Sequence, residues 1–300
     1  MKIGIDLGGS HIAIGVVNKE GKIVEKTEKT LKGIEKKKIK NVIEETIVEN
    51  VKRFQKEYEI TKIGIAIPGT VTNKTVVKSV NLGLENYEIV DNLKKKINLP
   101  IQIRNDAKCA ALSENTYGCL KGYNRSIFLT LGTGIGGAVI INNELLDTGD
   151  LPGCEIGHMV IEKDGLLCNC GRKGCFEKYA SMKAFKNNLR SELGYNEKVS
   201  GKELLAIIKN TKPQEENYLK IEKVITEYIE NLSIGIANLV NIFEPEAIGI
   251  GGSFVYFEEV LLEALRKSLL EKDKLFNPRK DINIQTAVLG NDAGIIGALL

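Results

Sequence analysis

The sequence lacks the features that mark membrane proteins and nucleic-acid-binding proteins. No apolar run approaches the ~20 residues that a membrane-spanning helix needs. Positive charge has little excess, because 42 basic residues face 39 acidic ones and leave a net charge of only +3. The lysine runs at 36–38 and 94–96 lie on patterns typical of solvated helix faces, which does not support a nucleic-acid footprint. Met1 leads directly into KIGIDLGG, which is neither a signal nor a transit peptide. We therefore expect a cytoplasmic protein with no membrane or nucleic-acid partner.

Histidine is scarce in this chain, and cysteine is clustered. There are two histidines and six cysteines, and CNCGRKGC contains Cys168, Cys170 and Cys175. A disulfide between Cys168 and Cys170 would close an implausibly tight ring and would leave Cys175 unpaired. In a reducing compartment, clustered cysteines are more often metal ligands than disulfides. Separate buried thiols are the alternative.

Zinc fits this cluster because it prefers four ligands in a tetrahedron. The cysteines supply three thiolates, and Gly171 and Gly174 permit the tight turns that fold them around one point. The expected fourth ligand is His158 in GCEIGHM, whereas His11 lies in a glycine-rich hairpin. Four protein ligands leave no open position for water. The sequence therefore predicts a structural zinc site formed by His158, Cys168, Cys170 and Cys175.

A chain of 300 residues with 43% hydrophobic content can form two lobes of roughly 100 to 180 residues. Three strand patterns within residues 2–27 precede a 3.6-residue apolar period from about 34 to 58, which predicts a helix. KIGIAIPGT predicts a buried strand that ends in a Pro-Gly turn. IQIRNDAKCAALSE predicts a strand that breaks at Asn105 and Asp106 and continues as a helix, with Asp106 as a favourable N-cap.

Two glycine-rich segments indicate an internal duplication. IDLGGSHIAIGVVN (5–18) and LTLGTGIGGAVIIN (129–142) share a strand, a glycine turn, a second strand and an Asn in the same columns. Glycine tips let backbone N–H groups approach an anion closely. A third turn, IGIGGSF (248–254), follows a strand and precedes a helix, which is where open α/β sheets bind ligands. The three turns favour a bound nucleotide, although neither the P-loop nor the Rossmann pattern is present.

Two aspartates near these turns have alternative roles. Asp6 ends the first strand beside Gly8 and Gly9, where its carboxylate could hold Mg²⁺ through water, or could bond its own backbone in the turn. Asp106 is either a helix N-cap or a general base that accepts a proton from an attacking hydroxyl during phosphoryl transfer. Asn105 could bond the same hydroxyl-bearing ligand. The residues alone leave these alternatives open.

Seven motifs of the sequence, in chain order, resemble those of the ROK family (repressors, open reading frames and sugar kinases). They are DLGGSH, the Pro-Gly turn, RNDAKCAALSE, LTLGTGIGGAVI, CEIGH, CNCGRKGCFE and IGIGGSF. The match runs from the first strand to the last helix. The resemblance implies an α/β protein with the actin-like ATPase fold, a duplicated ribonuclease H-like architecture of two lobes with a cleft between them. The lobes are expected at residues 1–117 plus 289–300, and at 118–288 with the zinc-binding loop.

The resemblance also implies ATP-dependent phosphorylation of a hexose at its 6-hydroxyl, with ATP, Mg²⁺ and a structural Zn²⁺. Glucose is the leading substrate. The alternatives are N-acetylmannosamine, N-acetylglucosamine, another hexose such as fructose or allose, or a sugar sensor without catalysis. NLGLENYEI lacks the tryptophan often seen after the Asn-Leu pair, so a hexose is a firmer expectation than glucose. A homodimer or a tetramer is expected by analogy with the family.

Matched position by position, the resemblance assigns roles to single residues. Asp106 resembles the catalytic base. His158 would orient the sugar with one nitrogen and bind zinc with the other. The positions that resemble the sugar-binding set are Gly69, Asn81, Asn105, Asp106, Glu155, His158 and Glu177. Nucleotide contacts are expected at Asp6, Gly8, Gly9, Ser10, Gly132, Thr133, Gly134, Gly251 and Gly252.

The chain departs from the family pattern at two further places. Ser10 and His11 stand where Thr-Lys is common, and Cys154 replaces a small Gly or Ala beside Glu155. Repressors of the family carry a helix-turn-helix domain before the kinase-like part. Since Asp6 already belongs to the first glycine hairpin, we expect an enzyme rather than a repressor.

Overall fold

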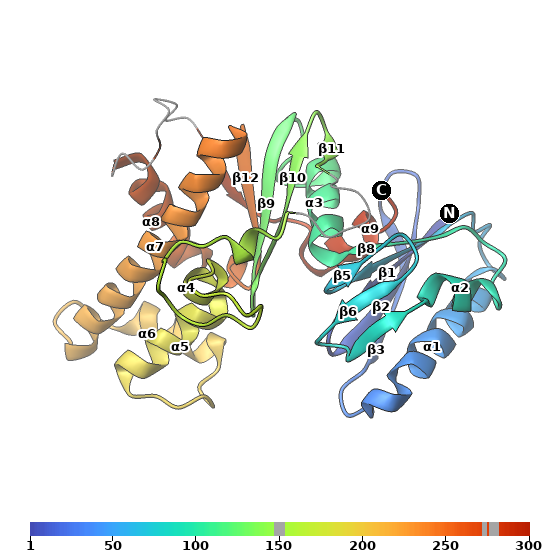
Figure 1. Ribbon diagram of the computed structural model, residues 1–300, viewed down its shortest axis with the longest axis horizontal. Coiled ribbons are helices and arrows are strands. Elements are labelled where there is room, and N and C mark those ends of the chain that lie inside the picture. Colours follow the sequence, from blue (N-terminus) through green and yellow to red (C-terminus); the bar gives the residue numbers. More distant parts are fainter. Residues whose placement is uncertain (147–153, 272–274, 276–281) are drawn as a thin grey trace. The chain divides into compact units, whose positions relative to one another are not determined.

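The computed structural model describes residues 1–146, 154–271, 275 and 282–300 (Figure 1). Contacts within the chain divide it into two compact units. The first unit comprises Met1–Gly122, Ala138–Cys154 and Val288–Leu300, and the second comprises Tyr123–Gly137 and Glu155–Ala287. The lobe boundaries expected from the sequence stay a prediction. Among the residues just given, no helix is both long and apolar enough to cross a bilayer.

Five strands form the sheet of the first unit, in the order β3-β2-β1-β4-β8 (Figure 1). They are β1 (Lys2–Leu7), β2 (His11–Val17), β3 (Ile23–Thr30), β4 (Ile63–Ile67) and β8 (Ile101–Asn105). The apolar runs of β1, β2 and β4 are buried on both faces, whereas the edge strand β3 alternates half-buried and exposed residues. β1, β4 and β8 are parallel, so Asp6 and Asn105 lie toward the same edge of the sheet.

Helices and a small sheet complete the first unit. The predicted apolar period buries Ile43, Ile47 and Val51, but the helix α1 (Ile39–Phe54) is shorter than predicted because a 3₁₀ turn at Lys36–Lys38 precedes it. The small sheet has the order β5-β6-β7. The remaining elements are β5 (Thr70–Val71), β6 (Val76–Ser79), β7 (Leu84–Tyr87), α2 (Ile89–Lys94), α3 (Asp106–Tyr117) and α9 (Ala293–Gly297).

The last helix packs directly on the first sheet through glycines. A Cβ on Gly4 would overlap the carbonyl oxygen of Ile295, and one on Gly64 would overlap that of Ala298. Gln102 Nε2 also donates to the carbonyl of Ala298 at 2.6 Å. The C-terminal segment is therefore a layer of the first unit, which brings Gly294 against the Asp6 carboxyl group.

The second five-stranded sheet repeats the strand order of the first. Its order is β11-β10-β9-β12-β13, and β12 pairs parallel with both β9 and β13 (Figure 1). The duplicated segments 5–18 and 129–142 therefore occupy equivalent positions in the two sheets. The strands are β9 (Arg125–Leu131), β10 (Ile135–Ile141), β11 (Glu144–Leu145), β12 (Ala247–Gly252) and β13 (Asn283–Thr286). The helices of the second unit are α4 (Glu177–Ala180), α5 (Met182–Leu193), α6 (Gly201–Asn210), α7 (Glu216–Phe243) and α8 (Glu258–Glu271).

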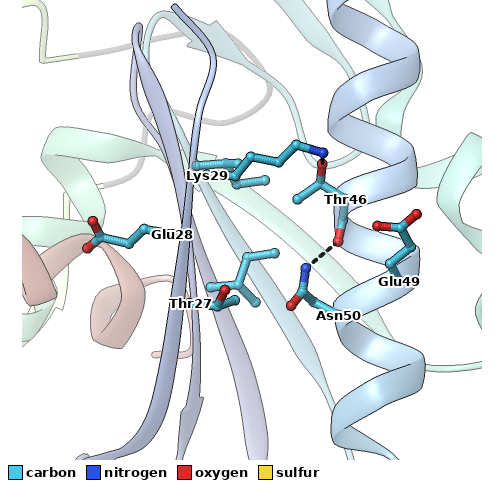
Figure 2. A pocket seen from close by; sticks show the side chains of 8 residues that line it. Thr27, Glu28, Lys29, Thr46, Glu49 and Asn50 are labelled. Atoms are coloured by element: carbon cyan, nitrogen blue, oxygen red, sulfur yellow. Dashed lines mark hydrogen bonds between the residues drawn. The ribbon is translucent and has the colours of Figure 1, made fainter.

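A hollow of about 180 Å³ lies between strands β2 and β3 and helix α1 (Figure 2). Lys29 Nζ donates to Thr46 Oγ1 at 3.0 Å, and Asn50 Nδ2 donates to the carbonyl of Thr46 at 2.8 Å. Thr46 thus bonds to two other polar residues of the hollow. None of the eight described lining residues belongs to the predicted site, so we assign this hollow no function.

A buried carboxylate fixes two of the chain segments that lie at the boundary of the first unit. Glu114 is fully buried near the end of α3. Its Oε2 accepts from the N–H of Cys119 at 2.9 Å, and its Oε1 accepts from the N–H groups of Val288 and Leu289 at 3.0 and 2.8 Å. Cys119 precedes the exit from this unit, and Val288 is where the chain re-enters it. Backbone N–H groups in the interior need acceptors, and the single carboxylate of Glu114 accepts hydrogen bonds from both segments.

Replacing Glu114 by alanine is expected to lower the free energy of unfolding by about 3 kcal/mol or more. Three N–H groups lose their acceptor, that of Cys119 in a buried bond and those of Val288 and Leu289 in partly buried bonds, and an unsatisfied buried group costs about 1–3 kcal/mol. Urea denaturation followed by circular dichroism measures the change. Glu45→Ala, at an exposed position of α1, is the control and should change stability by about 0.5 kcal/mol or less. Equal losses in the two variants would contradict the structural role of Glu114.

Candidate active site and metal centre

Asp106 is the first residue of α3, directly after β8. The expectation that Asp106 caps this helix is wrong, because the N-cap is Asn105. Asn105 keeps an extended backbone, which lets its Oδ1 accept from the N–H groups of Ala107 and Lys108 at 3.0 and 3.2 Å. Its Nδ2 donates to the carbonyl of Gly69 at 3.0 Å. Asn105 therefore contacts both the start of the helix and the Pro-Gly turn. Helix capping does not explain why an aspartate stands at position 106.

The Asp106 carboxylate has a raised proton affinity. Burial raises its pKa, and the hydrogen bonds that it receives, including one from the N–H of Ala107 at 2.9 Å, oppose that rise. A carboxylate whose pKa moves toward neutral pH is a better general base than an ordinary aspartate. Burial also distinguishes this group from a solvated helix cap.

Asp6 lies at the end of β1, before the first glycine turn. The pKa of Asp6 is raised to about 7, mainly by burial and in addition by the negative charge of Asp106, while Lys26 opposes the shift. In the turn, the N–H of Gly8 donates to the carbonyl of His11 at 2.9 Å, which closes the hairpin. A divalent cation beside Asp6 would favour the ionised carboxylate and offset this burial penalty. The carboxylate chemistry therefore fits Mg²⁺, which prefers oxygen ligands.

Replacing Asp6 by asparagine should make the unfolding free energy of the metal-free protein less dependent on pH. The folded-state pKa of about 7 lies above the ordinary value of 3.8. The protonated carboxyl group is therefore favoured by folding, and its contribution is complete below about pH 4 and is lost as pH rises through 7. Because the carboxyl group is partly exposed, we expect a difference of about 1–2 kcal/mol between pH 4 and 8. Urea titrations across this range compare wild type with Asp6→Asn, and parallel pH curves would contradict the shift.

Other predicted residues of the first unit are grouped around the same turns. A Cβ on Gly9 would come within 3.1 Å of Asn81 Cβ, so Asn81 lies beside the first glycine hairpin. Gly69 has φ +103° and faces the carbonyl of Lys78 closely enough to exclude a side chain. Ser10 Oγ lies 3.4 Å from His11 Nδ1. The first hairpin, Asn81 and the Gly69–Asn105 contact thus all belong to the first unit.

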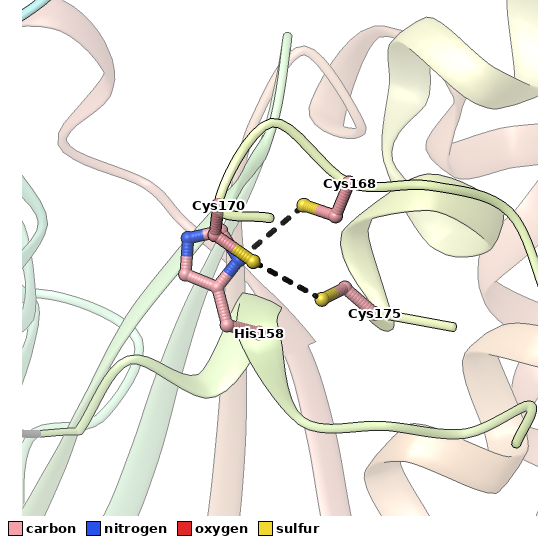
Figure 3. A group of neighbouring side chains, drawn as sticks. All are labelled: His158, Cys168, Cys170 and Cys175. Atoms are coloured by element: carbon pink, nitrogen blue, oxygen red, sulfur yellow. Dashed lines mark hydrogen bonds between the residues drawn. The ribbon is translucent and has the colours of Figure 1, made fainter. Parts of the chain in front are cut away.

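The structure brings the four predicted metal ligands together in the second unit (Figure 3). One donor atom from each lies within 4.8 Å of all the others. His158 Nδ1 is 3.6 Å from Cys168 Sγ, and Cys170 Sγ is 3.6 Å from Cys175 Sγ. A tetrahedral zinc ion with its usual bonds of ~2.3 Å would separate two sulfurs by about 3.8 Å. Three sulfurs and one imidazole nitrogen at this spacing fit zinc.

The loop around the ligands is braced by backbone and aromatic contacts. Gly174 has φ +76° and leaves no room for a Cβ beside the carbonyl of Glu162. Tyr179 Oη accepts from the N–H of Leu166 at 2.6 Å. Burial raises the pKa of Cys175 to about 12, whereas the backbone N–H of Arg172 lowers the pKa of Cys170. No pattern in the sequence marked Tyr179, although it lies only four residues after the last cysteine in CFEKY.

The second glycine hairpin lies next to the third glycine turn. Gly252 pairs with Leu131 in the parallel β9–β12 ladder, which places it beside the tip that begins at Gly132. Gly252 has φ +73°, and a Cβ there would overlap the carbonyl of Leu131. At the tip, the N–H of Gly132 donates to the carbonyl of Gly134 at 3.0 Å, and Thr133 is exposed. The predicted nucleotide positions at 132–134 and 251–252 therefore form one surface of the second unit.

The carboxylates expected to bind sugar in this unit differ in their surroundings. Glu155 is exposed, and its carbonyl accepts from the N–H of His158 at 3.0 Å. Glu177 is half-buried, with Oε1 3.6 Å from Cys168 Sγ and Oε2 3.2 Å from the N–H of Ile135. Cys154, which precedes Glu155, has φ +60°, a backbone conformation that glycine adopts more readily than other residues.

Comparison with known proteins gives the family. The sequence model of the ROK family matches residues 2–300. The chain belongs to the ROK family. Glucokinase of Thermotoga maritima is 31% identical to this ROK protein over 310 residues, covering 99% of this chain and 95% of that one. The xylose repressor of Caldicellulosiruptor bescii is 30% identical, covering 99% of this chain and 76% of the repressor.

A solved structure agrees with the family assignment. The ROK glucokinase of Streptomyces griseus, in complex with glucose and AMPPNP, has a TM-score of 0.81 and 28% identity, covering 99% of this chain and 97% of that one. The predicted fold class is confirmed: this ROK protein is an α/β protein with the actin-like ATPase fold of its structural relatives. The identical strand order of the two sheets is the duplication that the sequence predicted.

Proposed function

We propose that this ROK protein is an ATP-dependent sugar kinase that transfers the γ-phosphoryl group of ATP to the 6-hydroxyl of a hexose, with glucose as the preferred acceptor. The observation that carries the proposal is the carboxylate of Asp106 at the start of α3. Its pKa is raised, and it is not needed as the helix cap, because Asn105 caps α3. The similarity to glucokinases along nearly the whole chain supports the same activity.

Asp106 is proposed to act as the general base. Its carboxylate accepts the proton of the sugar hydroxyl while the hydroxyl oxygen forms a bond to the γ-phosphorus and the bond between that phosphorus and the β–γ bridging oxygen breaks. ADP leaves with the electron pair of the broken bond, and the proton stays on Asp106 until solvent removes it. The N–H of Ala107 bonded to Asp106 Oδ1 fixes the direction of the carboxylate.

The remaining residues are proposed to bind and orient the two substrates. The sugar is held by hydrogen bonds to polar groups that include both charged and amide side chains. Backbone N–H groups of the glycine turns bind the phosphates. Asp6 holds Mg²⁺, which neutralises charge on the phosphates when it is bound. In addition to Asp106, the proposed sugar ligands are Gly69, Asn81, Asn105, Glu155, His158 and Glu177. In addition to Asp6, the proposed nucleotide ligands are Gly8, Gly9, Ser10, Gly132, Thr133, Gly134, Gly251 and Gly252.

The metal centre is proposed to be a structural zinc site. His158 meets the cluster with Nδ1, which leaves its Nε2 for a sugar hydroxyl. The cluster stiffens the segment that carries both Glu155 and His158. From the family resemblance we further propose that the protein works in the cytoplasm as a homodimer or a tetramer.

The position and class of the acceptor can be tested directly. Wild-type protein is incubated with MgATP and glucose, and ³¹P NMR identifies the phosphate ester. The proposal predicts glucose 6-phosphate, and no ester with 6-deoxyglucose, which lacks the accepting hydroxyl. An ester at another carbon would contradict the proposed position.

A second candidate is a sugar-responsive regulator without catalysis. The similarity to the xylose repressor favours it. The same experiment separates the two functions, because a regulator binds a sugar in calorimetry but forms no ester with any sugar.

A further inference from the structure

Two segments that carry metal ligands converge on one residue of the second glycine hairpin. Ile135 is the first residue of β10 and directly follows the tip at 132–134. Its N–H donates to Glu177 Oε2 at 3.2 Å. Its carbonyl oxygen lies so close to Gly157 that a Cβ there would overlap it. Gly157 precedes the ligand His158, and Glu177 follows the ligand Cys175 by two residues.

We propose that Glu177 is a positioning residue that ties the metal-binding loop to the glycine hairpin at 132–134, so that an intact metal loop is needed for full affinity toward a nucleoside di- or triphosphate. This inference rests on the proposed function, which assigns the hairpin to the nucleotide phosphates. It gives Glu177 a role that is separate from sugar binding.

The position of Glu177 is determined from the metal side of the contact. Phe176, between Cys175 and Glu177, is fully buried, and its ring fills the space where a Cβ on Gly235 of α7 would lie. Cys175 also accepts from the N–H of Lys178 at 2.9 Å through its carbonyl. A shift of Cys175 therefore moves the start of α4, and with it the Glu177 carboxylate. Glu177 Oε1 also lies 3.6 Å from Sγ of a second ligand, Cys168, so the carboxylate borders the metal cluster.

The hairpin side of the contact is built to receive this carboxylate. A Cβ on Gly134 would overlap Glu177 Oε2, so only glycine leaves room for the carboxylate at this point of the tip. A further tie of the tip is the N–H of Lys183, which donates to the carbonyl of Gly132 at 3.0 Å. Without the bond from Ile135, the backbone N–H groups of the tip lose a fixed direction. Phosphate binding by such groups depends on that direction.

The test measures nucleotide binding without sugar, so that the sugar role of Glu177 does not enter. AMP-PNP affinity is measured by calorimetry, and amide hydrogen exchange at Ile135 is measured by NMR. Samples are wild type, Glu177→Ala, Glu177→Gln, Glu155→Ala and wild type after chelation of its metal. Glu155 is the matched control, because it is the other acidic residue of the proposed sugar set in this unit and is exposed.

Glu177→Ala is expected to weaken AMP-PNP binding about tenfold, the size of one lost hydrogen bond to a charged group, and to speed exchange at Ile135. Metal removal should produce both changes. Glu177→Gln keeps an acceptor oxygen and should retain most of the nucleotide affinity, which also controls for misfolding of the alanine variant. Glu155→Ala should change neither measurement more than about twofold.

Unchanged exchange at Ile135 in Glu177→Ala, or equal nucleotide affinity in Glu177→Ala and wild type, would overturn the inference. Wild-type protein that binds no AMP-PNP would contradict the proposed function instead. In that case exchange at Ile135, with and without metal, still decides whether the metal loop holds the hairpin.

Discussion

Asp106→Ala is expected to lower kcat for sugar phosphorylation by about 10²- to 10⁴-fold, the usual contribution of a general base. The loss should fall on kcat rather than on the KM for ATP, because Asp106 acts on the hydroxyl in the transition state. The helix should survive the change, since the cap that satisfies its first N–H groups is Asn105. Steady-state kinetics with the best sugar acceptor measures the effect.

Asp106→Asn is the matched variant for this experiment. It keeps the size and polarity of the side chain but cannot take up the proton, so it should be about as inactive as Asp106→Ala. Unfolding curves should place both variants within about 1 kcal/mol of wild type. Turnover within threefold of wild type in either variant would remove Asp106 from the proton transfer.

Replacing Cys175 by alanine should abolish metal binding and strongly destabilise the second unit. Structural zinc sites contribute about 10 kcal/mol or more at neutral pH, which is comparable to the whole stability of a domain. Cys175 is fully buried, and its backbone pairs with Val160 across the loop. We expect less than one metal ion per ten chains by elemental analysis, and rapid proteolysis within residues 155–177.

Cys119→Ala provides the control for loss of a thiol. Cys119 is also buried, but it belongs to the first unit and lies outside the metal cluster. This variant should keep one zinc ion per chain and the proteolytic resistance of wild type. Full zinc content in Cys175→Ala would contradict the four-ligand site, and an unchanged proteolysis pattern after metal loss would contradict its structural role.

The hairpins, the duplication and the metal cluster could be predicted because each leaves a local pattern in the sequence. Apolar strand patterns and glycine turns predicted β1 and β2, and the gapless match of 5–18 with 129–142 predicted an internal duplication, which the shared strand order of the two sheets displays. The C-x-C-G-x-x-G-C spacing named three ligands within eight residues. His158 was predictable because the chain offers only two histidines.

The features that the sequence did not predict depend on contacts between distant residues or on backbone geometry. Asn105 rather than Asp106 caps α3, because the extended backbone at Asn105 directs its amide oxygen to two N–H groups. The contact of Glu177 with Ile135 joins positions 42 residues apart, and that of Glu114 with Leu289 joins positions 175 residues apart. Neither leaves a local pattern, since a carboxylate on a helix is ordinarily read as a solvated side chain.

The measurement that tests the central claim most directly is ADP release by the purified, zinc-loaded protein with MgATP. The acceptors are glucose, N-acetylmannosamine, N-acetylglucosamine, mannose, fructose and allose, each compared with a reaction that contains no sugar. The account predicts sugar-dependent ADP release that is greatest with glucose and absent in Asp106→Ala. Release no faster with any sugar than without one, in a sample whose zinc content is confirmed, would contradict a kinase and favour the sugar-responsive regulator.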